Sequence, residues 1–184
     1  MDLRSCSNTY RSPDLKYGMT AIKGPWTADE LTLFLQEALM PLRLGCHHPD
    51  GGLWMLSLWY RWEDEAFLCA TGRDSDVARF LRKNDNVAFE VSTNAPPYMG
   101  VRGKGTATLS PDPEKTVLRN LLERYLGGTD SELAEMLLRD DREELVITIA
   151  PTRLFTWDFT PRMQTTLETS PAARQPEPES PKHR

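Results

Sequence analysis

The sequence predicts a mainly-β, α+β protein, a six-stranded antiparallel β-barrel with peripheral helices. Two observations favour this class. Segments with the apolar pattern of strands outnumber those with helical spacing, and several follow one another with only a short turn between them. The 184 residues are 39% hydrophobic and include five Trp, which is enough to fill one core.

The first predicted element is a helix that begins at a capping box. The side chains of Thr27 and Glu30 stand at the spacing at which each can bond the other's backbone N–H. Apolar residues then recur at helical spacing as far as Leu39. A strand over 42–47 follows, and the glycines at the end of 48–52 favour a hairpin turn there.

The segment 53–62 has the strongest strand pattern of the chain. Both of its faces are largely apolar, so we expect this strand to be central in the sheet and covered on both sides. Residues 66–71 form the next predicted strand. Gly72 to Asp74 then lead into a short helix that ends at Asn84.

Two further strands are predicted over 87–92 and 98–109. Gly100, Gly103 and Gly105 interrupt the second one. Glycines at this spacing suggest β-bulges, or a place where another group approaches the backbone closely.

The remaining elements are two helices and a closing strand. One helix is expected to begin at Pro113 and to end at Gly127, and the next is capped within 129–132. The final strand covers 145–159 and is kinked at Pro151.

We expect one folded domain over 25–160, between two terminal segments. Residues 1–24 are polar, with scattered apolar side chains, and predict a loosely ordered arm. Residues 161–184 are rich in proline and contain no aromatic residue. Such a segment cannot bury enough apolar surface to offset its chain entropy, so it predicts a disordered tail.

Charge and composition exclude several classes of protein. A net charge of −5 disfavours general binding to nucleic acid. No apolar stretch approaches the roughly 20 residues that cross a bilayer, and no secretory signal is present, so no membrane association is expected. The three widely spaced cysteines suit a reducing cytoplasm better than a disulfide framework.

Two clusters of polar residues are weak candidates for a site. Cys46, His47 and His48 are neighbours in a strand and hairpin, where successive side chains point to opposite faces, so we expect no metal centre. The carboxylates at 140–141 and 143–144 lie in a charged connector and predict a solvated turn rather than an acid/base pair. No catalytic residue is assigned.

The segment 70–75 is a better candidate. It runs from the end of a strand into the start of a helix, where free N–H groups favour an anion. Thr71 and Ser75 add hydroxyls, and Arg73 adds a cation that could bind phosphate. In the simpler alternative, Asp74 or Ser75 only caps the helix. Trp157 could stack on a planar ring, although a closing strand also needs large core residues.

Taken together, these segments resemble the pyridoxamine 5′-phosphate oxidase-like superfamily of FMN-binding split β-barrels. The resemblance covers roughly 28–159 and rests on the order and spacing of several motifs. They are the apolar strand 53–62, Ala-Phe-Leu-Cys-Ala-Thr-Gly-Arg-Asp-Ser at 66–75, Phe-Leu-Arg-Lys-Asn-Asp-Asn-Val at 80–87, Gly-Val-Arg-Gly-Lys-Gly-Thr-Ala at 100–107 and Thr-Trp-Asp-Phe at 156–159.

The resemblance implies a homodimer that holds FMN in two grooves between its subunits. The strand with Met55, Ser57 and Leu58 would contact the flavin ring through its backbone. Thr71 and Ser75 stand where the family binds the phosphate. Trp157 matches a position that reaches the flavin of the partner subunit in the oxidases.

The chain departs from the family at the phosphate site. Asp76 and Val77 occupy the positions of an Arg and a Lys that the oxidases place on the phosphate. The cations left to bind it are Arg73, Arg79, Arg82 and Lys83. The substrate-phosphate signature of the oxidases is also missing, so pyridoxamine phosphate is not the expected substrate.

The functional hypothesis is an FMN-dependent oxidoreductase that acts on a small molecule not identified by the sequence. A second hypothesis is a non-catalytic module on the same dimeric scaffold that holds haem, the deazaflavin F420 or a flavin. A third is a structural dimer whose ancestral cofactor site is vacant.

Overall fold

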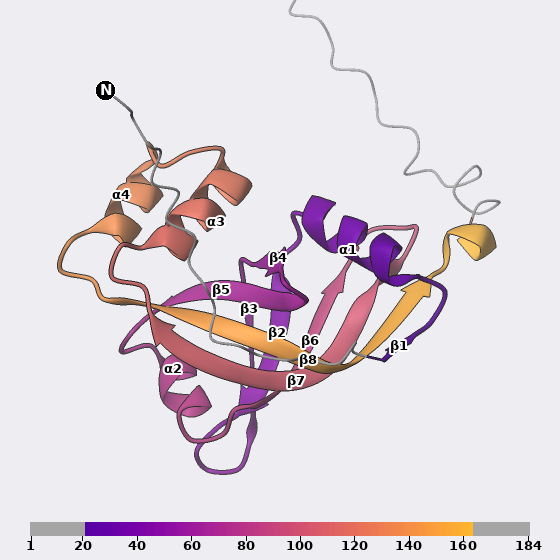
Figure 1. Ribbon diagram of the computed structural model, residues 1–184, viewed down its shortest axis with the longest axis horizontal. Coiled ribbons are helices and arrows are strands. Elements are labelled where there is room, and N and C mark those ends of the chain that lie inside the picture. Colours follow the sequence, from indigo (N-terminus) through magenta and orange to yellow (C-terminus); the bar gives the residue numbers. More distant parts are fainter. Residues whose placement is uncertain (1–20, 164–184) are drawn as a thin grey trace, which may run out of the picture.

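The computed structural model describes residues 21–163, and the predicted arm and tail fall mostly outside this range. Figure 1 shows the arrangement of its elements. In chain order they are β1 (Ile22–Lys23), α1 (Ala28–Glu37), β2 (Leu42–His47), β3 (Leu53–Leu58), β4 (Arg61–Glu63), β5 (Ala66–Gly72), α2 (Asp76–Leu81), β6 (Asn86–Ser92), β7 (Met99–Pro111), α3 (Thr116–Leu126), α4 (Glu132–Leu138) and β8 (Glu144–Asp158).

The strands form one sheet in the order β3-β2-β6-β7-β8-β5-β4, and β1 pairs with β8 in parallel. All other neighbours are antiparallel. β3 and β4 stand at opposite ends of this order, yet only Trp59 and Tyr60 join them in the chain. The ends of the two strands, Leu58 and Arg61, are three residues apart and can be separated by at most about 11 Å, so the sheet must curl until its ends almost meet. The result is the predicted antiparallel barrel, left open between β3 and β4. The predicted number of six strands is wrong, because the sheet has eight: the segment 53–62 is divided into β3 and β4, and β1 joins the edge of β8.

The ladder between β7 and β8 is the longest in the sheet. It runs from Met99 opposite Asp158 to Pro111 opposite Leu145, with one register shift at Lys104/Gly105. Figure 1 shows the two strands side by side along the molecule, with α3 and α4 on one side and α2 on the other. This register shift confirms the β-bulge predicted at the glycines of β7. It lies beside Pro151 of β8, which pairs with Gly105 and where a kink was predicted.

Inward-facing side chains of this curled sheet form the main core. The fully buried ones include Leu44, Phe67, Val91, Val101 and Ile147, which come from five different strands. α1 adds Leu31 and Leu35, and α2 adds Phe80 and Leu81. A smaller cluster packs α3 and α4 together through Leu118, Leu122 and Ala134.

Arg124 of α3 fastens that helix to α1. Its guanidinium donates hydrogen bonds to the main-chain carbonyls of Leu35, at 3.1 Å, and Ala38, at 2.6 Å. These carbonyls end α1, whose last turn has no basic residue of its own. A positive charge at the C-terminal end of a helix is stabilising, because the helix dipole places partial negative charge there.

Most predicted helix boundaries are confirmed. Thr27 and Glu30 form the complete capping box of α1, Ser75 caps α2, and Gly127 ends α3 with a φ of 76°. The prediction that the third helix begins at Pro113 is wrong, since α3 begins at Thr116. The Asp112 carboxylate causes this delay, because it accepts N–H bonds from the first residues of the helix, at 2.8 Å from Thr116 N.

The prediction of a central strand over 53–62 is also wrong. The segment is divided into β3 and β4, and β3 lies at the edge of the sheet. Leu53 is 84% exposed and Met55 is 70% exposed. The two-sided apolar pattern was typical of a covered strand, but nothing in residues 21–163 covers one face of β3.

The glycines of β7 provide a test of this packing. A Cβ added at Gly103 would lie 2.4 Å from the carbonyl oxygen of Arg153 and 2.6 Å from the Phe89 ring. We expect Gly103→Ala to lower the free energy of unfolding by about 1–3 kcal/mol, as overpacking does, measured by urea denaturation. Gly45→Ala is the control, because its Cβ would find nothing nearer than 3.7 Å. Equal stability of the two variants would contradict this account.

Candidate functional site

The outer face of the sheet carries a continuous row of side chains from β3 to β8. The register aligns Met55, Gly45, Ala88, Lys104 and Arg153 across the five strands β3, β2, β6, β7 and β8. A second row beside it consists of Ser57, Arg43, Glu90, Arg102 and Phe155. Because alternate strand residues face opposite ways, all of these lie on the side away from the core.

These rows enclose a groove of about 600 Å³. Its floor is formed by the small residues Gly45 and Ala88, and its apolar rim by Leu53 and Met55 of the edge strand. We call it the outer-face groove. Its lining consists of Arg43, Gly45, Cys46, His47, Leu53, Trp54, Met55, Asn86, Val87, Ala88, Phe89, Glu90, Arg102, Gly103, Lys104 and Phe155.

Positive charge predominates in this groove. Arg43 forms an ion pair with Glu90 at 3.3 Å and also donates to Ser92 at 3.1 Å. Arg102 lies over the Trp157 ring, 5.7 Å from its centroid. Within residues 21–163, neither Arg102 nor Lys104 forms an ion pair. No carboxylate of these residues therefore lies within 4 Å of either of the two cations.

A second hollow of about 390 Å³ continues past Arg102 and Phe155, which line both. It is bordered by Lys23, Trp157 and Phe159. Trp157 stands on the outer face of β8, opposite Gly100. It is thus partly exposed beside a hollow and is not part of the buried core, so it remains available for stacking.

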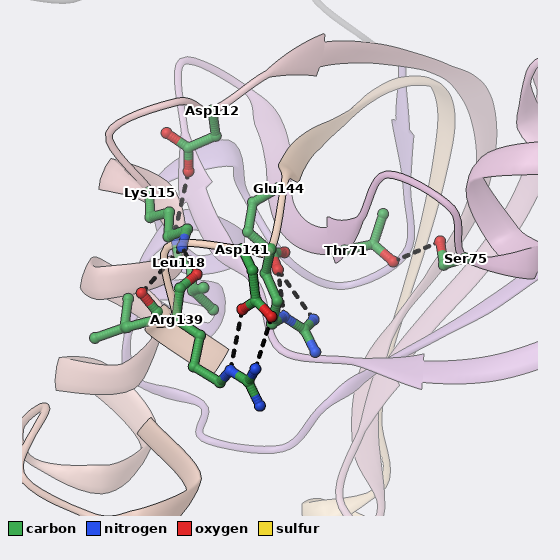
Figure 2. Close-up of polar contacts among 10 residues, drawn as sticks. Thr71, Ser75, Asp112, Lys115, Leu118, Arg139, Asp141 and Glu144 are labelled. Carbon is green, nitrogen blue, oxygen red and sulfur yellow. Dashed lines mark hydrogen bonds and ion pairs between the residues drawn. The ribbon is translucent and has the colours of Figure 1, made fainter. Parts of the chain in front are cut away.

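The predicted anion loop is well formed but uses its hydroxyls internally. Figure 2 shows the Thr71 hydroxyl at the end of β5 facing that of Ser75 at the start of α2, to which it donates at 2.9 Å. Ser75 Oγ in turn accepts the N–H of Ala78 at 3.2 Å. Ser75 therefore caps α2, as the simpler alternative for this segment predicts.

The predicted cations around this loop differ in their availability. Arg73 forms an ion pair with Glu143, and Arg79 one with Asp76 at 2.5 Å. Arg82 donates to the carbonyl of Arg73 at 2.9 Å. The exposed Lys83 side chain makes no ion pair within residues 21–163.

One chain does not bring all predicted site residues together. In the loop, Thr71 bonds to Ser75 and Arg82 bonds to the carbonyl of Arg73. Met55 and Ser57 face outward from β3, whereas Leu58 is half-buried on the other face. Trp157 is on β8, four strands away in the sheet order.

The other polar candidates have structural roles. The Glu144 side chain is buried and pairs with Arg142 at 3.0 Å, so the prediction of a solvated turn is wrong at this position. Figure 2 shows the neighbouring cluster, in which the buried Lys115 ammonium donates to the carbonyls of Leu138, at 2.9 Å, and Arg139. Asp141 pairs with Arg139 at 2.6 Å.

The histidine and cysteine side chains do not converge. Cys46 is buried toward the core, whereas His47 is exposed on the outer face. Burial raises the pKa of the Cys46 and Cys69 thiols, which disfavours the thiolate that metals and redox partners require. Residues 21–163 contain no group of three His, Cys, Asp or Glu side chains able to hold a metal ion.

Sequence reasoning missed the outer-face groove. Arg102 and Lys104 were noted only as part of a glycine-rich strand, and Gly45 and Ala88 not at all. The alternation of charged residues and glycines in β7 was an available signal. The sequence does not show the pairing of β2 with β6, which brings Gly45 and Ala88 into the same row.

Comparison with solved structures shows the split β-barrel fold of the pyridoxamine 5′-phosphate oxidase-like proteins. An F420 reductase is 24% identical, with a TM-score of 0.57, over 65% of this chain and 92% of its own. A candidate pyridoxamine 5′-phosphate oxidase from Listeria innocua is 16% identical, with a TM-score of 0.54, over 70% and 95% of the two chains. The haem storage protein HutZ from Vibrio cholerae is 17% identical, with a TM-score of 0.53, over 70% and 92%.

No protein-family model and no curated protein matches the chain. The expected fold is confirmed by the structural comparisons, while the named proteins differ in what they bind.

In residues 21–163, none of the helices has the length and apolar character to span a membrane.

The role of Ser75 as the N-cap of α2 can be tested by mutation. Ser75→Ala removes the side-chain acceptor that caps α2, and we expect it to lower the free energy of unfolding by about 1 kcal/mol in a thermal or urea melt. Ser57→Ala, at an exposed position of β3, serves as control and should change stability by less than about 0.5 kcal/mol. An unchanged melt for Ser75→Ala would refute the capping role.

Proposed function

We propose that this chain is a homodimeric flavin-type oxidoreductase, which binds FMN or the deazaflavin F420 between its subunits and acts on a small molecule. One observation carries this proposal, the exposed apolar face of the edge strand β3. Leu53 and Met55 are 84% and 70% exposed, and they border the outer-face groove. Apolar surface of this kind usually marks an interface or a ligand site.

The unpaired edge of β3 suits a flavin ring. Within the described chain β3 pairs only with β2, so on its other side alternate N–H and C=O groups are free. The heteroatoms along a flavin need such donors and acceptors. We propose that the backbone at Met55, Ser57 and Leu58 holds the ring, with Thr71, Ser75 and the nearby cations holding the phosphate.

Residues from two subunits complete this site in our proposal. Trp157 lies four strands from β3 in its own chain, so it would reach the ring bound to the partner subunit. When bound, the flavin supplies the electron-transfer chemistry. The chain's residues bind and orient it, and the apolar rim excludes water from one side of the ring.

The alternative is a module that holds haem without turnover. It is favoured by one observation, since the imidazole of His47 lines the outer-face groove. Imidazole is a common haem ligand. The similarity to a haem storage protein is consistent with this alternative, and the similarity to an F420 reductase is consistent with the first.

Titration of the purified protein separates the two. We expect FMN or F420 to bind with quenching of its fluorescence, and riboflavin, which lacks the phosphate, to bind at least tenfold more weakly than FMN. Haemin would then give no Soret shift. A Soret band at stoichiometric haemin without any flavin binding would establish the alternative. A protein that binds none of these ligands would refute both.

Arg73 tests the proposed phosphate site. Arg73→Gln should weaken FMN binding about fivefold or more, because it removes the cation nearest to Thr71 in the chain. The matched control is Glu143→Gln, which frees the same guanidinium from its ion pair and should leave FMN affinity equal or higher. If both variants bind FMN like the wild type, Arg73 does not hold the phosphate.

The apolar face of β3 tests the dimer. The chain mass is 21.0 kDa, and light scattering should give about twice this value. The double variant Leu53→Asp/Met55→Asp should be monomeric yet folded, because both side chains are exposed within one chain. Leu33→Asp, at an exposed position of α1, is the control and should remain dimeric. A monomeric wild type would contradict the proposal.

A further inference from the structure

We infer that residues 175–181 of this chain, Gln-Pro-Glu-Pro-Glu-Ser-Pro, dock into the hollow beside Trp157. In the docked state the prolines lie on the aromatic side chains of the hollow, and Glu177 and Glu179 pair with the cations on its two sides. The inference goes beyond the proposed function and requires no cofactor. A flavin held by the partner subunit would compete with this segment for Trp157.

Three aromatic side chains line this hollow of about 390 Å³. Phe155 and Trp157 are alternate residues of β8 and therefore lie on the same face, and Phe159 follows just after the strand ends. Phe159 is 40% exposed, and neither of the other two is buried. Proline-rich segments in the polyproline II conformation dock on aromatic-lined grooves, so the hollow has the surface that such a segment needs.

A cation stands on each side of Phe155. The strand register pairs Phe155 with Arg102 of β7 on one side and with Lys23 of β1 on the other (Figure 1). Both cations are exposed, and neither forms an ion pair in the part of the chain that the structure describes. Neighbouring strands are about 4.8 Å apart, so the Cα atoms of the two cations are separated by about 10 Å. An acidic ligand can therefore be paired on both sides of the aromatic row.

The segment 175–181 has the complementary pattern. A polyproline II helix has three residues per turn and rises about 3.1 Å per residue, so Pro178 and Pro181 would share one face, about 9 Å apart. Glu177 and Glu179 flank Pro178 in the chain and would point to either side of that face. The segment contains these two carboxylates and no cation. With its prolines on the aromatic row, it brings one carboxylate to each side, where Lys23 and Arg102 stand.

The main chain leaves the described part of the structure next to this hollow. The N–H of Met163, the last described residue, donates to the carbonyl of Phe159 at 3.1 Å. Only residues 164–174 separate Met163 from the docking segment, and an unstructured chain of that length spans about 20 Å on average. A tether this short gives an effective concentration of about a millimolar, so even a weak site is occupied by its own chain. This position favours the same chain over a separate partner as the occupant.

Fluorine NMR of the full chain labelled with 5-fluorotryptophan tests the contact. The chain has five Trp, and Trp157→Phe assigns the resonance of Trp157. Glu177→Lys/Glu179→Lys should shift that resonance, because the reversed charges release the segment, and should leave the other Trp resonances in place. Glu168→Lys, which reverses a charge outside the segment, is the control and should shift none of them. An unmoved Trp157 resonance in the double variant, or an equal shift in the control, would overturn the inference.

Disulfide formation in the full chain locates the segment. A Cys6→Ser background leaves only the buried Cys46 and Cys69 as native thiols. With oxidised glutathione, Lys23→Cys/Ser180→Cys should form an intrachain disulfide at least tenfold faster than Arg119→Cys/Ser180→Cys. Arg119 is the matched control, because it is equally exposed but lies on α3 and does not line the hollow.

Two outcomes of the disulfide experiment would contradict the inference. They are equal rates for the two pairs, or disulfides between chains instead of within one chain, seen on a non-reducing gel. Neither experiment contains a flavin, so both test the docked segment separately from the proposed function.

Discussion

The structure depends on the long antiparallel ladder between β7 and β8. The other strands of this order extend from one of these two. On the side of β7 they are β6, β2 and β3, and on the side of β8 they are β5 and β4. Gly103 and Gly105 allow the two backbones to approach where a Cβ would collide with a carbonyl oxygen. The register shift at this point bends the ladder, and bulges of this kind help a sheet to curl into a barrel.

The open barrel leaves the edge strand β3 without a neighbour on one side. Its inward face is packed, since Trp54 contacts the Phe80 ring with centroids 5.5 Å apart, while Met55 faces out over the groove. The same sheet therefore supplies a core on one face and a surface with an apolar rim and cations on the other. The proposed cofactor site uses this outer face at β3.

Local signals in the sequence predicted local structure well. The capping box at Thr27 and the glycine at the end of α3 depend only on neighbouring residues. The position of β3 could not be predicted, because an apolar strand has the same pattern whether it is covered by its own chain or by a ligand or partner. The groove was missed for a related reason. Gly45 and Lys104 are far apart in the chain, and only strand pairing joins them.

Amide hydrogen exchange with and without FMN tests the central claim, that β3 and the face beside it form the ligand site. The account predicts that FMN slows exchange over residues 53–58 and 71–75, with little change in α3 and α4. Protection confined to α3 and α4, or FMN binding that leaves residues 53–58 unaffected, would contradict it.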